Sequence, residues 1–450
     1  MGTAIDQLLA LANATDRFSY PPEELRHIQL QAMNERFQDR KDRIKLLKHR
    51  AEAAGISAIS QFSDMVPLLF PHTAYKSYPE SFLTGEKWDR LCKWLETVSS
   101  YPITAVNAAD INGIDDWIDQ LEANGHYVSC SSGTTGKSAM LIASGQDAAW
   151  WRQDIANVFS WGSGVPQSRD YRMMGLAPVA AVPKNRIMGE ALEDAFGDPD
   201  KEHYRLNMPP ITVGQLVQMV VLRKKMTDGS ALPEEIAALQ DIGKERESAL
   251  ERAMHEAAEK LVRHRDEKLM LSGMWSSLYK VASLVRELGY SGKDFNPDNC
   301  IYVGGGLKRA QLPDDYQSFV HDTFNIPPQR NFQMYGMQEI NTGMPRCNEG
   351  NRYHVPPWLV PLILDESGEH LLDHNGGNIE GRAAFFDISQ DGSWGGVISG
   401  DKINIDFSPC KCGSASPSIA DNITRYSDLK DGDDKIACSG TVDAYVRGIS

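Results

Sequence analysis

Apolar side chains recur at helical spacing through the first 100 residues of the chain. Leu8, Leu9 and Leu11 are followed by Leu25, Ile28, Leu30 and Met33. Because residues three and four apart share one face of an α-helix, this pattern predicts helices with one buried stripe. Residues 1–100 are therefore predicted to form a helical N-terminal region.

A different pattern follows over residues 101–340, where short apolar runs alternate with longer helical segments. The runs HYVSC and AMLIAS are followed by a second group of apolar runs that starts near Met270. This alternation is typical of α/β folds with buried strands, so we predict an α/β nucleotide-binding core over 101–340. Residues 211–268 read as a helical insertion, and their charge density favours a solvent-exposed face over a partner-docking surface.

Residues 341–450 are predicted to form a β-rich subdomain. Glycine-rich turns such as DESGEH, HNGGN and QDGSWGG separate short apolar runs there. Such turns between alternating runs are typical of antiparallel strands. The expected fold class is therefore α/β, with a helical region before the core and a β-rich subdomain after it.

Composition and charge narrow the function classes. The chain has 450 residues, of which 41% are hydrophobic and 24% charged, and its formal net charge is -15. An acidic surface repels the phosphate backbone of nucleic acids and anionic membranes, so neither is an expected partner. No apolar run is long enough to span a membrane, and the N-terminus has no basic segment before its apolar run. A cytoplasmic protein is predicted.

A glycine- and hydroxyl-rich segment follows the apolar pair Tyr127-Val128. Glycines allow the backbone to approach an anion, hydroxyls donate to phosphate oxygens, and a lysine adds positive charge. The Walker A motif is excluded, because it needs four residues between its first glycine and the Gly-Lys pair and only two stand here. The alternative is a polar hairpin turn. The segment comprises Ser131, Ser132, Gly133, Thr134, Thr135, Gly136 and Lys137.

Three of the cysteines and one of the histidines in the β-rich region form a candidate metal-binding set. Six residues separate Cys347 from His354, and Cys410 and Cys412 form a C-x-C pair. Three thiolates and one imidazole make a common structural zinc set, which leaves no open position for catalysis. The spacing alone leaves buried free thiols as the alternative.

The segment SSGTTGKS resembles the nucleotide-binding signature of the adenylate-forming superfamily, which includes the acyl-CoA synthetases. That family also has a glycine-rich adenine-binding segment, a Tyr-Gly-x-x-Glu segment and a Gly-Asp pair, in this order. Matching segments occur in the same order here, and the resemblance implies that they bind ATP. Their residues are Gly304, Gly305 and Gly306, then Tyr335, Gly336, Met337, Gln338 and Glu339, and then Gly400 and Asp401.

The resemblance also implies a role for each group. Lys137 and Glu339 would be catalytic, with Glu339 binding Mg²⁺, and Asp401 would accept hydrogen bonds from the ribose hydroxyls. The implied reaction is ATP-dependent activation of a fatty or aryl carboxylic acid to acyl-AMP with release of pyrophosphate. Gln338 stands where many members have threonine, so an amide would replace one hydroxyl contact.

Within the superfamily, the segments GGGLK, RCNEGNRYH and CKCG are most similar to the acyl-protein synthetase and phenylacetate:CoA ligase branch. This likeness implies a structural zinc ion held by Cys347, His354, Cys410 and Cys412, and the absence of most or all of the mobile C-terminal domain. The acyl group would pass to an external acceptor such as an acyl-carrier protein, CoA, an amine or a reductase. An aryl-CoA ligase and a non-catalytic nucleotide-binding scaffold are the alternatives.

One departure from that branch concerns the acyl acceptor. Acyl-protein synthetases that resemble this chain carry a cysteine just after a terminal Arg-Gly, where Ile449 stands here. An aliphatic side chain is not a nucleophile. No acyl-thioester is therefore expected on the chain's own tail.

Overall fold

The computed structural model describes residues 2–103, 106–107, 110–130, 137–178, 181–305 and 311–429. The chain divides into two compact units: unit 1 comprises Met1–Asp154 and Gly336–Ser450, and unit 2 comprises Ile155–Tyr335. The predictions for residues 131–136, Gly306, Ile449 and the end of the chain lie outside the described residues.

Unit 2 is built on a parallel sheet that is buried on both faces. Along β6, Leu269 and Leu271 join one apolar cluster while Met270 joins another, because successive side chains point to opposite faces of a strand. Parallel sheets covered by helices on both faces require this pattern. In spatial order the strands are β5 (Tyr204–Arg205), β4 (Arg172–Gly175), β6 (Leu269–Gly273), β7 (Cys300–Val303) and β8 (Asn331–Tyr335).

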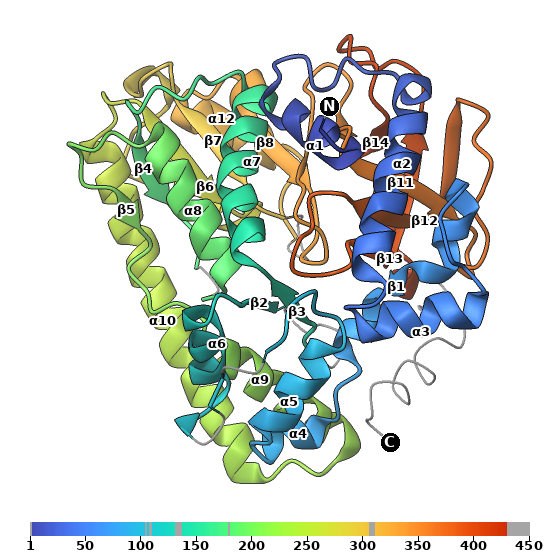
Figure 1. The fold of residues 1–450 in the computed structure, drawn as a ribbon. Helices are drawn as coiled ribbons and strands as arrows, with labels where there is room; N and C mark the ends of the chain where they lie inside the picture. Colours follow the sequence, from blue (N-terminus) through green and yellow to red (C-terminus); the bar gives the residue numbers. More distant parts are fainter. Residues whose placement is uncertain are drawn as a thin grey trace. The chain divides into compact units, whose positions relative to one another are not determined.

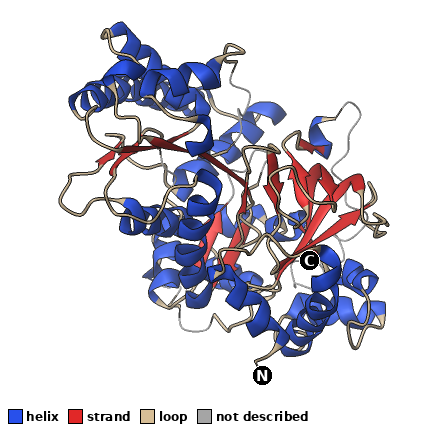
Figure 2. Cartoon of the chain, turned by 90° about the horizontal axis from the view of Figure 1, so that it is seen from above, coloured by secondary structure: helices blue, strands red, loops and turns tan. Residues whose placement is uncertain are grey.

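Helices cover both faces of this sheet, as Figure 2 shows. One cluster contains residues of α8 (Pro183–Phe196), and the other contains residues of α10 (Pro233–Arg263), α11 (Trp275–Glu287) and α12 (Tyr316–Phe324). The predicted helical segment 211–268 forms α9 (Val213–Asp228) and α10.

Helix α10 is exposed over its first half, as the charge density indicated, but not over its second half. Ala253, Ala257 and Leu261 are buried and pack in the cluster that also contains Leu269 and Leu271 of β6. The prediction rested on the high average charge of the segment and overlooked this apolar stripe, whose members recur at four-residue spacing.

Helices make up much of the N-terminal part of unit 1. They are α1 (Ala4–Ala10), α2 (Pro22–Arg40), α3 (Lys45–Ala54), α4 (Glu80–Thr84), α5 (Trp88–Glu96) and α6 (Ile114–Ala123), with 3₁₀ helices at Phe62–Leu68 and His72–Lys76. Figure 1 gives their order along the chain. None of the described helices is long and apolar enough to cross a membrane.

The β-rich part of unit 1 is a largely antiparallel sheet in which β13 (Gly396–Asp406) takes a central place. Its order is β10 (Arg352–His354), β14 (Ser418–Ala420), β13, β12 (Asn378–Asp387) and β11 (Leu359–Leu364); β1 (Phe70–Pro71) and β15 (Thr424–Arg425) also pair with β13. A separate hairpin joins β2 (Tyr127–Cys130) to β3 (Met140–Ala143), and β9 (Met344–Pro345) and α7 (Gly145–Ser163) complete the elements that position the site.

Candidate functional site

The cysteines and the histidine selected from the sequence meet in space. One ligand atom from each of Cys347, His354, Cys410 and Cys412 lies within 4.8 Å of all the others. The Sγ atoms of Cys347 and Cys410 are 3.8 Å apart, and Cys412 Sγ lies 3.3 Å from His354 Nε2. Ligand–metal bonds of roughly 2.0–2.3 Å in a tetrahedron separate the ligand atoms by about 3.5–3.8 Å. The group therefore has nearly the dimensions of a four-coordinate metal site.

Local structure fixes these ligands before any ion binds. His354 ends β10, and its Nδ1 lies 3.0 Å from Ser416 Oγ, which leaves Nε2 directed at the cluster. A turn closed by the Gly413 N–H on the Cys410 carbonyl carries both thiols of the C-x-C pair. A Cβ atom on Gly350 would stand 2.4 Å from Cys410 Sγ, so only glycine fits beside the thiols.

The protonation of the cluster is also compatible with a metal site. Burial lowers the pKa of His354 to about 4, so its imidazole is neutral at pH 7 and can present a ring-nitrogen lone pair to a cation. Burial, together with the neighbouring thiols, raises the pKa of Cys347 to about 12. A cation that binds here would displace the thiol protons.

Lys137 is held at the start of the segment that leads into β3. Its Nζ donates to the Tyr78 carbonyl at 2.7 Å and lies 5.4 Å from the centroid of the Tyr78 ring. The Tyr78 hydroxyl in turn donates to the Ser138 carbonyl at 2.8 Å. Tyr78 thus fixes both the ammonium group and the backbone at the end of the predicted phosphate loop.

Gly304, in the predicted adenine-binding segment, and Tyr335 lie at the same edge of the sheet of unit 2. Val303 of β7 pairs with Gln333 of the parallel neighbour β8, so Gly304 and Tyr335 both lie at carboxyl ends of strands. Ligands of open α/β sheets bind at that edge. Gly305 has a φ of +78°, a left-handed conformation that favours glycine.

The remaining predicted ATP-binding residues lie in unit 1. Gly336, Met337, Gln338 and Glu339 follow β8, and the Glu339 carbonyl accepts a hydrogen bond from Gln390 Nε2. Gln338 Oε1 is buried without a hydrogen-bond partner among the described residues, so this amide has an unused acceptor. Asp401 lies in β13 with its carboxylate 3.6 Å from Arg425 Nε.

A buried polar network joins the end of the β2–β3 hairpin to the segment that contains Glu339 and Asn341. Asp147, at the start of α7, is fully buried and accepts four hydrogen bonds of 2.6–2.8 Å from the backbone N–H groups of Ser144, Asp391 and Gly392 and from the side-chain amide of Asn341. Burial raises the pKa of Asp147, although its hydrogen bonds oppose that shift. Asn341 stands two residues after Glu339, so Asp147 links the end of β3 to that segment.

Two further carboxylates extend the network. Asp391 accepts from Arg40, Tyr101 and the Ser144 hydroxyl at 2.7–2.9 Å. Asp387 accepts from the backbone N–H groups of Asn341 and Thr342, both at 2.9 Å. The candidate site is therefore supported by buried carboxylates that hold loops together.

The sequence motifs did not predict this network. One local signal was available, because Ser144 and Asp147 form the S-x-x-D pattern of a capping box directly after the apolar run of β3. That pattern predicts where α7 begins. It does not reveal that the same carboxylate also binds Asn341 and Gly392.

Comparisons with known proteins show the fold. No family model matches the chain, and no curated protein matches its sequence. An open-conformation structure of 2-hydroxyisobutyryl-CoA ligase, in complex with 2-HIB-AMP and CoA, aligns with a TM-score of 0.57 and 12% identity, over 95% of this chain and 81% of that one. The same ligase in its thioesterification state aligns with a TM-score of 0.55 and 13% identity, over 91% and 70%.

A third solved structure, the acyl acid amido synthetase AtGH3.15 with 2,4-DB, aligns with a TM-score of 0.44 and 10% identity, over 92% of this chain and 70% of that one. The two alignments with 2-hydroxyisobutyryl-CoA ligase confirm the predicted mixed α/β fold and place this chain among proteins with that ligase's fold. The predicted acyl-protein synthetase branch stays a prediction at these identities.

Proposed function

We propose that this protein activates a carboxylic acid with ATP, forming an acyl adenylate and pyrophosphate. The observation that carries the proposal is the fold, which 95% of the chain shares with a ligase held in complex with an acyl adenylate. The motif residues support it, because Gly304, Gly305 and Tyr335 occupy the ligand-binding edge of the parallel sheet.

In the proposed reaction, a carboxylate oxygen of the acid attacks the α-phosphorus of ATP, and the bond from that phosphorus to the pyrophosphate oxygen breaks. Lys137 would leave the Tyr78 carbonyl to neutralise charge on the phosphates, and Glu339 would hold Mg²⁺. Asp401 would accept from the ribose hydroxyls. The segment from Ser131 to Gly136 would contribute donors to the phosphate oxygens.

We also propose that the Cys/His cluster binds a structural zinc ion. Three thiols and one imidazole within 4.8 Å are a preferred donor set for zinc, and a closed set of four ligands leaves no position for substrate. The ion would link β10 to the loop before β14, where His354 and the C-x-C pair lie. Its role is therefore in folding.

For the acyl acceptor we propose an external thiol, with CoA as the first to test. The matched ligase structures contain CoA as well as the adenylate. A carrier-protein thiol, an amine or a reductase remains a further candidate. Ile449 cannot accept an acyl group, so a stable thioester at that position is not expected.

ATP–pyrophosphate exchange, screened with fatty and aryl acids, tests the proposed activation. Lys137→Ala and Glu339→Ala are each expected to lower the exchange rate by roughly 10²–10³-fold, the usual cost of a lost charge-stabilising group. Because both residues lie in loops, the melting temperature is expected to change little.

Lys45→Ala is the matched control, since it removes an exposed lysine of α3 outside the site. The proposal fails if Lys137→Ala keeps near-native exchange. ATP binding without exchange, for any acid, would instead favour the non-catalytic scaffold.

A further inference from the structure

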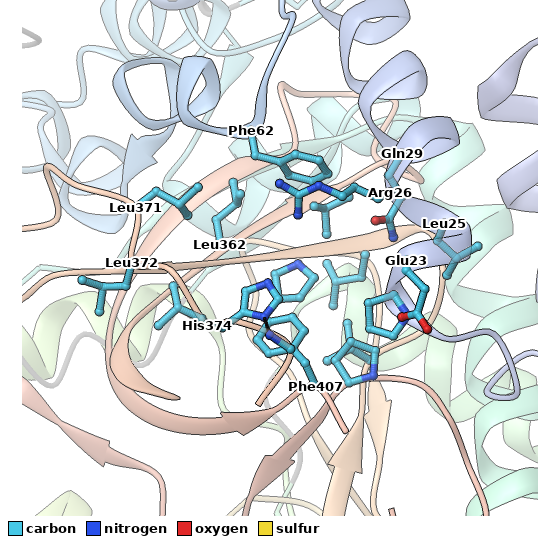
Figure 3. Close-up of a pocket in the computed structure, with 18 of the residues that line it drawn as sticks. Glu23, Leu25, Arg26, Gln29, Phe62, Leu362, Leu371, Leu372, His374 and Phe407 are labelled. Atoms are coloured by element: carbon cyan, nitrogen blue, oxygen red, sulfur yellow. Dashed lines mark hydrogen bonds between the residues drawn. The ribbon is translucent and has the colours of Figure 1, made fainter. Parts of the chain in front are cut away.

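A cavity of about 660 Å³ opens in unit 1, between α2 and β11. Figure 3 shows residues that line it, most of which come from the first turns of α2, from β11 and from the loop that follows β11. The volume falls within the roughly 300–1,000 Å³ that is typical of small-molecule sites. None of the described residues predicted to bind ATP lines it.

The body of the cavity is hydrophobic. Leu25 of α2, Leu362 of β11 and the loop residues Leu371 and Leu372 contribute aliphatic surface, and Phe62 contributes an aromatic face. Leu25 and Leu362 are themselves buried in the core, so this wall is preformed. A ligand that fills the cavity must therefore present hydrocarbon to it.

The guanidinium group of Arg26 places a positive charge beside this hydrophobic wall. Its guanidinium carbon lies 4.5 Å from the centroid of the Phe62 ring, which holds the group over the cavity. No carboxylate lies within ion-pairing distance of Arg26 in the part of the chain that the structure describes, although Glu23 stands one turn earlier on the same helix. The planar donor fork of Arg26 is thus available to an anion.

His374 supplies a second donor. Its ring stacks on Phe407 with a centroid separation of 3.6 Å and an interplanar angle of 13°. Its Nδ1 accepts the Gly376 N–H at 3.0 Å, so the neutral ring carries its proton on Nε2. Burial, together with the charge of Arg26, lowers the pKa of His374, which keeps the ring neutral.

The acidic residues at the cavity limit the charge of its ligand. Glu23 and Asp373 both line it, and the Asp373 carboxylate already accepts the Asn375 N–H at 3.1 Å. Two carboxylates beside one guanidinium oppose a dianion such as a phosphate monoester. They are compatible with a single negative charge placed directly on Arg26.

We propose that this cavity is a binding site for an amphipathic monocarboxylate. The hydrocarbon part contacts Leu362, Leu371 and Phe62, and the carboxylate accepts hydrogen bonds from Arg26 and from Nε2–H of His374. The site is separate from the predicted ATP-binding residues and does not depend on the proposed adenylation.

The cavity also adjoins the Cys/His cluster. Val355, which follows His354, and Pro409, which precedes Cys410, both line it. A metal ion that fixes His354 and Cys410 would therefore also fix one wall of the cavity. Removal of the metal is expected to weaken the ligand together with the fold.

Isothermal titration of the full chain with octanoate, without ATP, tests the site. Octanoate is expected to bind, and Arg26→Gln is expected to weaken it about tenfold, the usual effect of losing one charge-assisted hydrogen bond. Octanol and octylamine share the hydrocarbon tail but lack the carboxylate, so both are expected to bind more weakly than octanoate. Arg90→Gln is the matched control, because it removes an exposed arginine of α5 that does not line the cavity.

Several outcomes overturn the proposal. Absence of octanoate binding would do so, as would binding that Arg26→Gln leaves unchanged, which would place octanoate in another pocket. Octanol binding as tightly as octanoate would indicate a purely apolar cavity, and tighter octylamine would assign the site to Glu23 and Asp373.

Photolabelling gives an independent readout. A fatty acid with a diazirine on its tail is expected to label peptides from residues 355–376, and labelling confined to other peptides contradicts the site. Lys137→Ala should retain octanoate binding even where it loses pyrophosphate exchange, so failure of this site and failure of the proposed function are distinguishable.

Discussion

The interiors of the two units differ in how many charged side chains they bury. Among the described buried residues of unit 2, Lys184 is the sole charged one, and both faces of its sheet are packed with hydrocarbon. Unit 1 instead buries Arg40, Asp147, Asp387 and Asp391 in one hydrogen-bonded network.

This difference indicates that buried hydrogen-bonded carboxylates define the positions of loops more precisely than apolar packing does. Apolar packing is non-directional and tolerates small shifts, whereas a buried carboxylate is satisfied by only one arrangement of its donors. In unit 1 that arrangement fixes the segment that follows Glu339 and the loop at Ser144. Four variants test whether the two interiors behave differently.

The largest effect is expected on loss of the Cys/His cluster. Cys410→Ser, or a strong chelator, removes part of the coordination shell and should destabilise unit 1 by more than about 5 kcal/mol, because structural metal binding is coupled to folding. Elemental analysis and thermal unfolding measure this. Cys92→Ala removes a buried thiol outside the cluster and should leave the metal content unchanged. A chain that binds no zinc, or a fully stable Cys410→Ser, contradicts the assignment.

Asp147→Ala should come next. It leaves donors from Ser144, Asp391, Gly392 and Asn341 without an acceptor, at a cost of about 3–5 kcal/mol. Pyrophosphate exchange per folded molecule should also fall, because the Asn341 segment carries Glu339. Denaturant unfolding and exchange assays separate the two effects. Unchanged exchange in the folded fraction would reduce the network to a purely structural role.

Leu271→Ala makes the matching change in unit 2. Leu271 is fully buried in β6, so its truncation should cost about 2–4 kcal/mol through the cavity that it leaves. Exchange activity below the unfolding transition should stay within about threefold, because apolar packing supports the sheet without orienting a reacting group. Parallel losses of stability and activity, as in Asp147→Ala, would erase the contrast between the units.

Asp401→Asn should have the smallest effect. The amide keeps the size of the side chain but loses the charge that favours two ribose hydroxyl donors and Arg425. We expect the KM for ATP to rise about tenfold with little change in kcat. Steady-state kinetics at saturating acid measure this, and a change confined to kcat would contradict the ribose role.

Local patterns predicted much of what local physics determines. The alternation of Leu269, Met270 and Leu271 follows from a strand buried on both faces, and the Cys/His spacing led to four residues that meet in space. The prediction for α10 was correct only for its exposed first half. The high charge of the segment obscured the buried residues Ala253, Ala257 and Leu261 in its second half.

The buried network could not be predicted from the sequence, because its contacts join distant segments of the chain. Asp147 binds Asn341 across 194 residues and Gly392 across 245 residues of sequence. Such contacts are set by how distant segments pack, and no periodicity or short motif encodes them. The cavity beside Arg26 has the same origin, since α2 and β11 meet only in the folded chain.

The carboxylates of unit 1 also reverse the usual relation between loops and amide hydrogen exchange. Backbone N–H groups in loops normally exchange quickly, but those of Ser144, Thr342 and Gly392 donate to fully enclosed carboxylates. We expect these amides to exchange only when unit 1 opens as a whole. In an exchange experiment these loop positions would therefore rank with the central strands among the last protons to leave, and would record the global opening of unit 1 at the place where its chemistry is proposed.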